Sequence, residues 1–190
     1  RDYMNMCDAE SVHKLIEAVY EPHYAHYKEE FGKTIAGFFS DEPELGNGPM
    51  YSNEPLGAAL DLPWCHTLEP VLEESLGADW KNCMPYLWES DLDSKQTARV
   101  RYAYMDAVTN KVKAAFSEQM GEWCRGHGVE YIGHVVEDNN CHARMGGSLG
   151  HYFRGLAGQD MAGIDDIGGQ VMPQGEDGPK VFMRFMKRDG

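Results

Sequence analysis

The sequence predicts an α/β fold, namely a fragment of an eightfold β/α barrel with parallel strands and outer helices. Three short apolar runs alternate with longer segments of helical periodicity, and parallel strands need such long crossovers between them. Three strands close no barrel, and a complete barrel takes about 250 residues. The chain has 190 residues and starts abruptly at Arg1. We therefore expect residues 1–190 to form one partial barrel domain.

The first two predicted elements are a helix and a strand. Over residues 8–31, mostly apolar side chains recur every three or four positions, as they do on the buried face of a helix. Asp8 can cap the start of this helix, Pro22 can kink it and Gly32 can end it. Residues 34–41 then form a short apolar run between polar neighbours, which predicts a buried strand.

A long loop and two helices follow. Residues 41–66 are rich in proline and glycine, which predicts a loop of a length that is usually functional. Residues 67–76 predict a short helix that Gly77 closes. The strongest helical signal covers residues 97–125, where large apolar side chains are spaced by four, four, four, four and three positions. These side chains are Tyr104, Val108, Val112, Phe116, Met120 and Trp123.

The C-terminal half adds two strands. Residues 129–137 are a largely apolar run that follows two glycines, which predicts the second strand. A weak helix is expected around residues 151–157, and residues 163–166 predict a third, very short strand. The order strand, helix, strand, helix, strand is typical of a parallel sheet with helices outside it.

The composition restricts the classes of partner. With 31 acidic and 17 basic side chains the formal charge is −14, and such a surface repels nucleic-acid phosphates. No apolar run reaches the roughly 18 to 20 residues of a membrane-spanning helix, so neither nucleic acid nor a membrane is an expected partner. The sequence has no Asn-x-Ser/Thr acceptor, which slightly favours a cytoplasmic location but leaves it open.

Acidic residues follow each predicted strand. In an α/β barrel the active site lies at the carboxyl ends of the strands. Glu42 follows the first strand, Glu137 ends the second and Asp165 ends the third. Like charges and partial burial raise carboxyl pKa values toward the range useful for acid/base catalysis. Acidic residues at strand ends can also cap helices or simply lie in water. Of the three residues, Glu42 is the one for which we favour a catalytic role most.

Two sets of motifs resemble known glycoside hydrolases. Residues 37–43, Gly-Phe-Phe-Ser-Asp-Glu-Pro, resemble the strand-four signature of clan A glycoside hydrolases, with Asp41 in place of the usual Asn. Residues 131–144 and 150–154, together with residues 163–165, are similar to a group of bacterial proteins described as glycosyl hydrolases related to family 2 or to rhamnosidases. This similarity covers residues 2–167.

The resemblance implies a barrel enzyme that hydrolyses O-glycosidic bonds without a cofactor. It places Glu42 at the end of strand four as the general acid/base, and Glu137 at the end of strand five as the other catalytic candidate in this chain. The family's second catalytic carboxylate would follow strand seven, beyond Gly190. Because a glycosidase normally uses two carboxyl groups, we expect little activity from residues 1–190 alone.

The substrate-binding candidates are polar or aromatic residues at the predicted strand ends and in the loops. An exposed aromatic ring can serve as a platform for a sugar, although packing is the commoner role of such a ring. A histidine within a strand can point toward the site or be a hydrogen-bonded core residue. The candidates are Asp41, Trp64, His134, Asn139, His142 and Asp165.

Two other functions stay open. The chain could be a non-catalytic carbohydrate-binding or scaffold piece, which would need aromatic platforms but not Glu42. It could also be a metal-dependent hydrolase, because imidazoles and carboxylates cluster between His134 and His151. No recognised ligand spacing occurs there, so no metal is expected. The exposed edges of an incomplete barrel also predict self-association.

Overall fold

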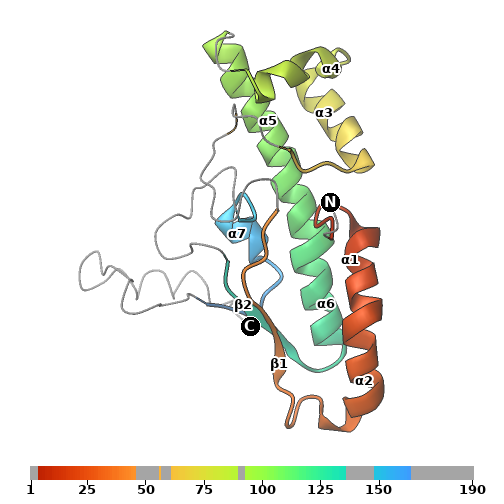
Figure 1. The fold of residues 1–190 in the computed structure, drawn as a ribbon. Coiled ribbons are helices and arrows are strands. Elements are labelled where there is room, and N and C mark those ends of the chain that lie inside the picture. Colours follow the sequence, from red (N-terminus) through yellow and green to blue (C-terminus); the bar gives the residue numbers. More distant parts are fainter. Residues whose placement is uncertain (1–3, 46–55, 57–60, 90–92, 136–147, 164–190) are drawn as a thin grey trace, which may run out of the picture.

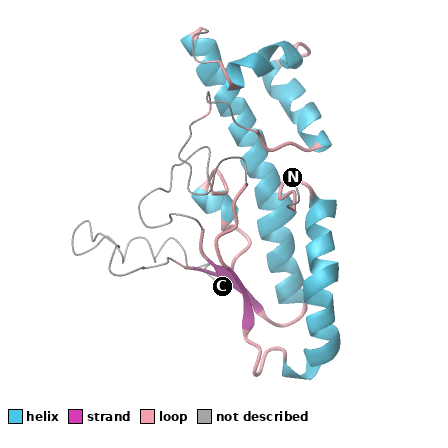
Figure 2. Ribbon diagram, in the orientation of Figure 1, coloured by secondary structure: helices cyan, strands magenta, loops and turns pink. Residues whose placement is uncertain are grey.

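The computed structural model shows an α/β fold with a small parallel sheet packed against long helices (Figures 1 and 2). It describes residues 4–45, 56, 61–89, 93–135 and 148–163. The predicted parallel α/β architecture is therefore confirmed for the described residues.

The chain begins with a broken helix, as predicted for residues 8–31. It comprises α1 (Ala9–Leu15), a π-helical turn (Ile16–Tyr20), α2 (Glu21–Tyr27) and a 3₁₀ turn (Lys28–Glu30). The Asp8 carboxylate caps α1 by accepting a hydrogen bond from the Glu10 amide at 3.1 Å. The π turn lies just before Pro22, which has no N–H to offer the carbonyl four residues earlier. Proline thus interrupts the helix without ending it.

Three parallel strands form the sheet in the order β1-β2-β3. They are β1 (Gly37–Ser40), β2 (Glu130–Gly133) and β3 (Met161–Ala162). Phe38 pairs with Tyr131, and Gly133 pairs with both Ser40 and Ala162. The first two strands lie within their predicted ranges but are shorter.

The predicted position of the third strand was wrong. The strand begins two residues before the predicted range of 163–166, of which residues 164–166 lie outside the described part of the chain. The Gly163 amide still donates to the Gly133 carbonyl, at 2.6 Å. Pairing with β2 defines this strand, because two residues are too few to carry a periodic pattern of their own.

Helices connect β1 to β2. A 3₁₀ turn (His66–Leu68) leads into α3 (Glu69–Leu76), which Gly77 ends with φ +92°, as predicted. Next come α4 (Trp80–Cys83) and a 3₁₀ turn (Met84–Leu87). Within the predicted loop 41–66, residues 41–45 and 61–65 are described and belong to no helix or strand.

The longest helical segment leads into β2. It consists of α5 (Ser94–Val112), a π-helical turn (Lys113–Glu118) and α6 (Gln119–Gly126), and it contains the predicted helix 97–125. Its apolar side chains are spaced by four residues, more than the 3.6 residues of an α-helical turn, so on a regular α-helix they would drift around the axis. The π turn takes up extra residues within this series, and Val108, Val112 and Phe116 are all buried.

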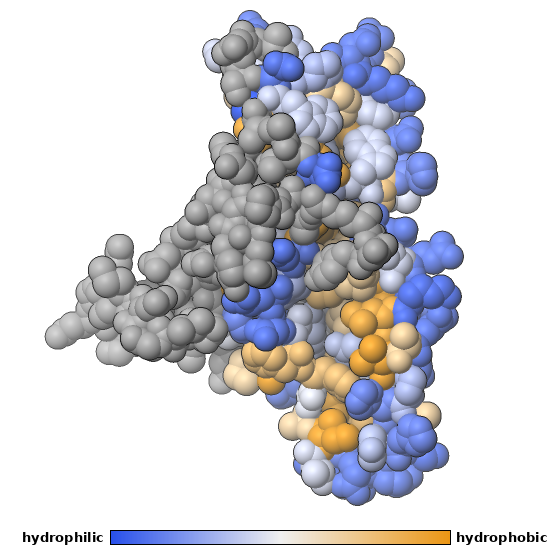
Figure 3. Space-filling view, viewed as in Figure 1, coloured by the Kyte–Doolittle hydropathy of each residue, from blue (hydrophilic) through white to orange (hydrophobic). Residues whose placement is uncertain are grey.

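The core lies between the sheet and these helices. Phe38 stacks on Tyr20 of the N-terminal π turn, with ring centroids 4.4 Å apart, and meets Trp123 of α6 edge-on at 5.7 Å. The Trp123 indole N–H donates to the Glu21 carboxylate at 2.7 Å, which ties α6 to α2. Phe39 points to the opposite face of the sheet. In Figure 3, apolar residues reach the surface beside β1 and the N-terminal helices.

The short helix α7 (Tyr152–Gly155) completes the described structure. It lies within the predicted helix 151–157 and contacts α5 and the π turn that follows α5. The part of the β1-to-β2 connection formed by α5 and its following π turn therefore packs against α7, which lies in the connection from β2 to β3.

Candidate active site at the strand ends

Two predicted site residues meet where β1 and β2 end. Asp41 directly follows β1, and His134 directly follows β2. The His134 Nε2 atom lies 2.8 Å from the Asp41 Oδ1 atom. The two residues are 93 positions apart in sequence, and they meet because neighbouring parallel strands end at the same edge of a sheet. The amide of His134 also donates to the carbonyl of Ser40 at 3.2 Å.

The two partners differ sharply in exposure. The His134 side chain is 7% exposed and the Asp41 side chain is 81% exposed. A buried imidazole that donates through Nε2 thus holds one oxygen of a carboxylate whose other oxygen faces solvent. Such a carboxylate can accept a hydrogen bond from a hydroxyl group of a ligand without first having to be ordered.

Glu42 is exposed at the same edge, next to Asp41. The following residue, Pro43, is buried, and the Leu45 amide donates to the Ser148 carbonyl at 2.8 Å. The segment that carries Glu42 is therefore fixed at both ends, by the Asp41 hydrogen bond before it and by the Leu45 contact after it. This arrangement holds a carboxyl group at the strand ends where solvent and a ligand can reach it.

A buried polar cluster that sequence reasoning missed lies behind this edge. Tyr131 of β2 is fully buried, and burial raises the pKa of its phenol to about 12, an effect that the nearby Ser40 and Gln159 side chains oppose. Gln159 is also buried and approaches Gly133 so closely that a Cβ there would lie 3.0 Å from its Nε2 atom. The phenol stays protonated at neutral pH. A polar side chain within a predicted buried strand was the available signal for Tyr131.

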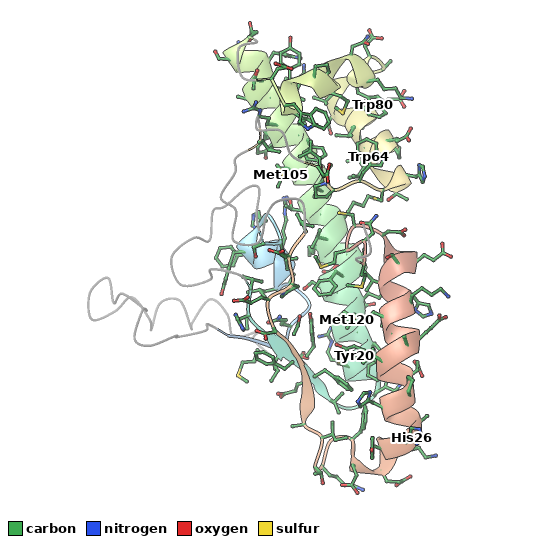
Figure 4. All side chains as sticks on the ribbon, in the orientation of Figure 1. Tyr20, His26, Trp64, Trp80, Met105 and Met120 are labelled. Carbon is green, nitrogen blue, oxygen red and sulfur yellow. The ribbon has the colours of Figure 1, made fainter. Side chains whose placement is uncertain are left out.

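Trp64 lies apart from this edge. Its ring stacks on Trp80 of α4 at a centroid distance of 5.9 Å, and its backbone carbonyl accepts a hydrogen bond from the Asn5 side chain (Figure 4). The structure thus gives Trp64 a packing partner among the helices, with part of the ring exposed. The other predicted residues, namely Glu137, Asn139, His142 and Asp165, lie outside the described residues.

The described residues bring together no group of three or more His, Cys, Asp or Glu side chains that could hold a metal ion. Of the residues that suggested a metal centre, His134 binds Asp41, whereas His151 accepts a hydrogen bond from the Arg154 amide at 3.3 Å. Glu137, Asp138 and His142 lie outside the described part of the chain.

In the described ranges, no helix combines the length and the apolar character that crossing a membrane requires.

Comparison with known proteins gives no relative. No protein-family model matches the chain, and neither does any curated protein or solved structure.

Proposed function

We propose that this chain is part of the catalytic barrel of a glycoside hydrolase, with Glu42 as the general acid/base that protonates the leaving oxygen. The observation that carries the proposal is the edge where β1 and β2 end. There, a buried His134 fixes the exposed Asp41, and an exposed Glu42 follows directly. A carboxyl group for proton transfer next to a fixed hydrogen-bond acceptor for a hydroxyl group is what glycoside cleavage needs on the leaving-group side.

The two faces of the sheet support the barrel part of the proposal. All-parallel sheets are normally covered on both faces. Here Phe38 packs against helix side chains on one face, while Phe39, Ile132 and Met161 form an in-register row on the other. Phe39 and Met161 are 60% and 57% exposed. In a barrel this row would face the interior, which apolar side chains from other strands fill.

The strand order agrees with the same interpretation. The order β1-β2-β3 follows the sequence with no reversal. A doubly wound sheet reverses its order at a switch point and places helices on both faces. A barrel keeps one direction around its circumference and places all helices outside.

The chemistry follows from the positions of these groups. The Glu42 carboxyl group donates its proton to the glycosidic oxygen as the bond to the anomeric carbon breaks. The Asp41 carboxylate, held by His134, accepts a hydrogen bond from a sugar hydroxyl. A second carboxyl group acts as nucleophile at about 5 to 5.5 Å from the first, or as base at about 6.5 to 9.5 Å. Glu137, four residues past the end of β2, is the candidate in this chain.

The test compares full-length wild-type protein with its Glu42→Gln variant on a panel of neutral aryl glycosides. Loss of a general acid is expected to lower the rate by about 10² to 10⁴. Glu29→Gln, which changes an exposed glutamate of the 3₁₀ turn before β1, is the matched control and is expected to keep the wild-type rate. Equal rates for wild type and Glu42→Gln, or no turnover of any glycoside by the wild type, contradict the proposal.

A further inference from the structure

A small pocket with charged and polar side chains in its walls lies between α5 and the segment that leads into α7. Its volume is about 140 Å³. Four of its lining residues come from one face of α5 and three from the segment at α7; they are Tyr102, Met105, Asp106, Thr109, Gly150, His151 and Arg154. None of them belongs to the strand-end site described above.

Arg154 and Asp106 form a fixed pair in the wall of this pocket. The Arg154 Nη1 atom lies 2.8 Å from the Asp106 Oδ1 atom and donates to the Thr109 hydroxyl at 2.8 Å. That hydroxyl donates its own proton to the Met105 carbonyl at 2.7 Å, so it accepts from Arg154. Within the described part of the chain, the side-chain contacts of Arg154 all use Nη1. No contact among these residues uses the N–H groups on Nε and Nη2, which are the donors that this side chain can offer to a ligand.

His151 adds a neutral donor to the pocket. Its Nδ1 atom accepts a hydrogen bond from the Arg154 amide at the start of α7, so the neutral ring carries its proton on Nε2. Partial burial and the neighbouring positive charge of Arg154 lower the pKa of His151. Both effects keep the imidazole uncharged at neutral pH.

The backbone brings the two walls close together at Gly150. This residue has φ +73°, and a Cβ there would lie 2.8 Å from the Met105 methyl group. The positive φ favours glycine here, and the absence of a Cβ leaves room for the Met105 and Thr109 side chains of α5. The polar groups on both walls are held by packing as well as by hydrogen bonds, which lowers the entropic cost of binding a ligand.

Tyr102 places an aromatic ring at the same pocket. It is the most exposed of the large apolar or aromatic side chains in the described residues, at 69%. A phenol ring left in water offers an amphipathic surface that can cover the C–H face of a ligand ring. Beside it, the paired charges of Asp106 and Arg154 offer an acceptor and donors for neighbouring hydroxyl groups.

The charges in the pocket select the class of ligand. An anion would meet the Asp106 carboxylate, and a cation would meet the Arg154 guanidinium. A neutral molecule with hydroxyl groups satisfies both without leaving either charge unpaired. A pyranose ring has this chemistry, with apolar faces and donors and acceptors around its edge.

The pocket and the strand-end site adjoin the same short segment of the chain. A Cβ at Gly150 would lie 3.8 Å from the Leu45 side chain. The Leu45 amide also donates to the Ser148 carbonyl. Leu45 lies three positions after Glu42 in the sequence, a length of chain of at most about 11 Å. Both sites therefore border the segment that follows β1.

We propose that this pocket is a second carbohydrate-binding site, which takes a neutral pyranose ring of an oligosaccharide that also occupies the strand-end site. The proposal that one oligosaccharide occupies both sites rests on the proposed glycosidase function. The proposal that the pocket binds a sugar ring does not. Tyr102 stacks on the ring, and Asp106 and Arg154 bind adjacent hydroxyl groups.

The experiment measures binding by calorimetry in the full-length protein with Glu42→Gln, so that no ligand is hydrolysed. The probes are neutral methyl pyranosides and neutral disaccharides. Tyr102→Ala and Asp106→Asn are each expected to weaken binding at least about tenfold, since each removes a main contact. Tyr27→Ala, which removes an exposed tyrosine of α2, is the matched control and is expected to leave the affinity unchanged.

The outcomes separate this proposal from the proposed function. Saturable binding that depends on Tyr102 and Asp106 supports the pocket, even if no glycoside is hydrolysed. Absence of saturable binding to every probe overturns it, and so does equal affinity of the Tyr102→Ala and Tyr27→Ala proteins. A third result would support the strand-end site and contradict the pocket. In it, hydrolysis depends on Glu42 but not on Tyr102, and the Tyr102→Ala and Tyr27→Ala proteins bind the probes with equal affinity.

Discussion

Phe38 and Phe39 are consecutive residues of β1, yet they lie in opposite surroundings. Phe38 packs among Tyr20, Phe31 and Trp123 on the side that the helices cover. Phe39 lies 60% exposed on the other side, where it contacts the His134 ring. This difference shows that the described helices cover only one face of the sheet. The open face is where a further layer of structure or a second copy of the chain would pack.

The same division runs through the strand-end site. His134 is buried, although its ring contacts Phe39, whereas its partner Asp41 extends into solvent. The buried partner thus positions the polar pair, and the exposed partner presents it to solvent. Substitutions on the two sides should therefore differ in their effect on stability.

The largest effect is expected where the packed side has its closest backbone contact. A Cβ at Gly158 would clash with the Ser117 carbonyl oxygen, and the Gly158 amide donates to the Ser117 hydroxyl at 2.8 Å. Gly158→Ala must separate these segments, and we expect it to lower the free energy of unfolding by more than about 3 kcal/mol. Urea denaturation measures this change.

Gly126→Ala is the control for this substitution. At Gly126 a Cβ would meet no atom within 4 Å, and the residue ends helix α6. Alanine there is expected to be neutral or to stabilise the helix by up to about 1 kcal/mol. Similar losses of stability in the two variants would show that the close approach of Gly158 and Ser117 does not matter.

The second prediction tests the two faces directly. Phe38→Ala should lower the free energy of unfolding by about 2 to 3 kcal/mol, somewhat less than for a fully buried phenylalanine because Phe38 is partly exposed. Phe39→Ala should change it by no more than about 0.5 kcal/mol. Thermal or urea unfolding of the two variants gives the comparison. A loss for Phe39→Ala as large as that for Phe38→Ala would mean that the open face is covered in solution.

Self-association of the chain remains a prediction, and Phe39→Ala also bears on it. If a second copy covers the open face, wild-type protein should dissociate on dilution and Phe39→Ala should shift the equilibrium toward the monomer. Sedimentation measures both.

Much of the fold could be predicted because local patterns encode it. The helix over residues 97–125, the Asp8 cap and the ending at Gly77 all depend on neighbouring residues, and the structure confirms them. The spacing of four along the longest helix even contained the signal for its π turn, although the prediction was for a regular helix. The meeting of Asp41 and His134 follows from parallel pairing of two correctly predicted strands.

The parts that could not be predicted depend on contacts between distant segments. The position of β3 is set by pairing with Ile132 and Gly133, not by a pattern of its own. Likewise, Arg154 meets Asp106 from 48 positions away, and Gln159 meets Gly133 through close packing of the backbone. No periodicity in the sequence records such contacts, so the pocket beside α5 and the contact between Gln159 and Gly133 emerge only from the structure.

The smallest expected effect concerns the two ends of one hydrogen bond. His134→Ala removes a buried ring that also contacts Phe39, and we expect it to lower the free energy of unfolding by about 2 kcal/mol. Asp41→Ala removes an exposed carboxylate, and water can replace it at His134 Nε2, so a loss below about 1 kcal/mol is expected. Asp41→Asn keeps the acceptor oxygen and should leave stability unchanged. Urea unfolding of the three variants measures the loss of unfolding free energy in each. A greater loss for Asp41→Ala than for His134→Ala would show that the exposed carboxylate, rather than the buried imidazole, contributes more to the stability of this edge.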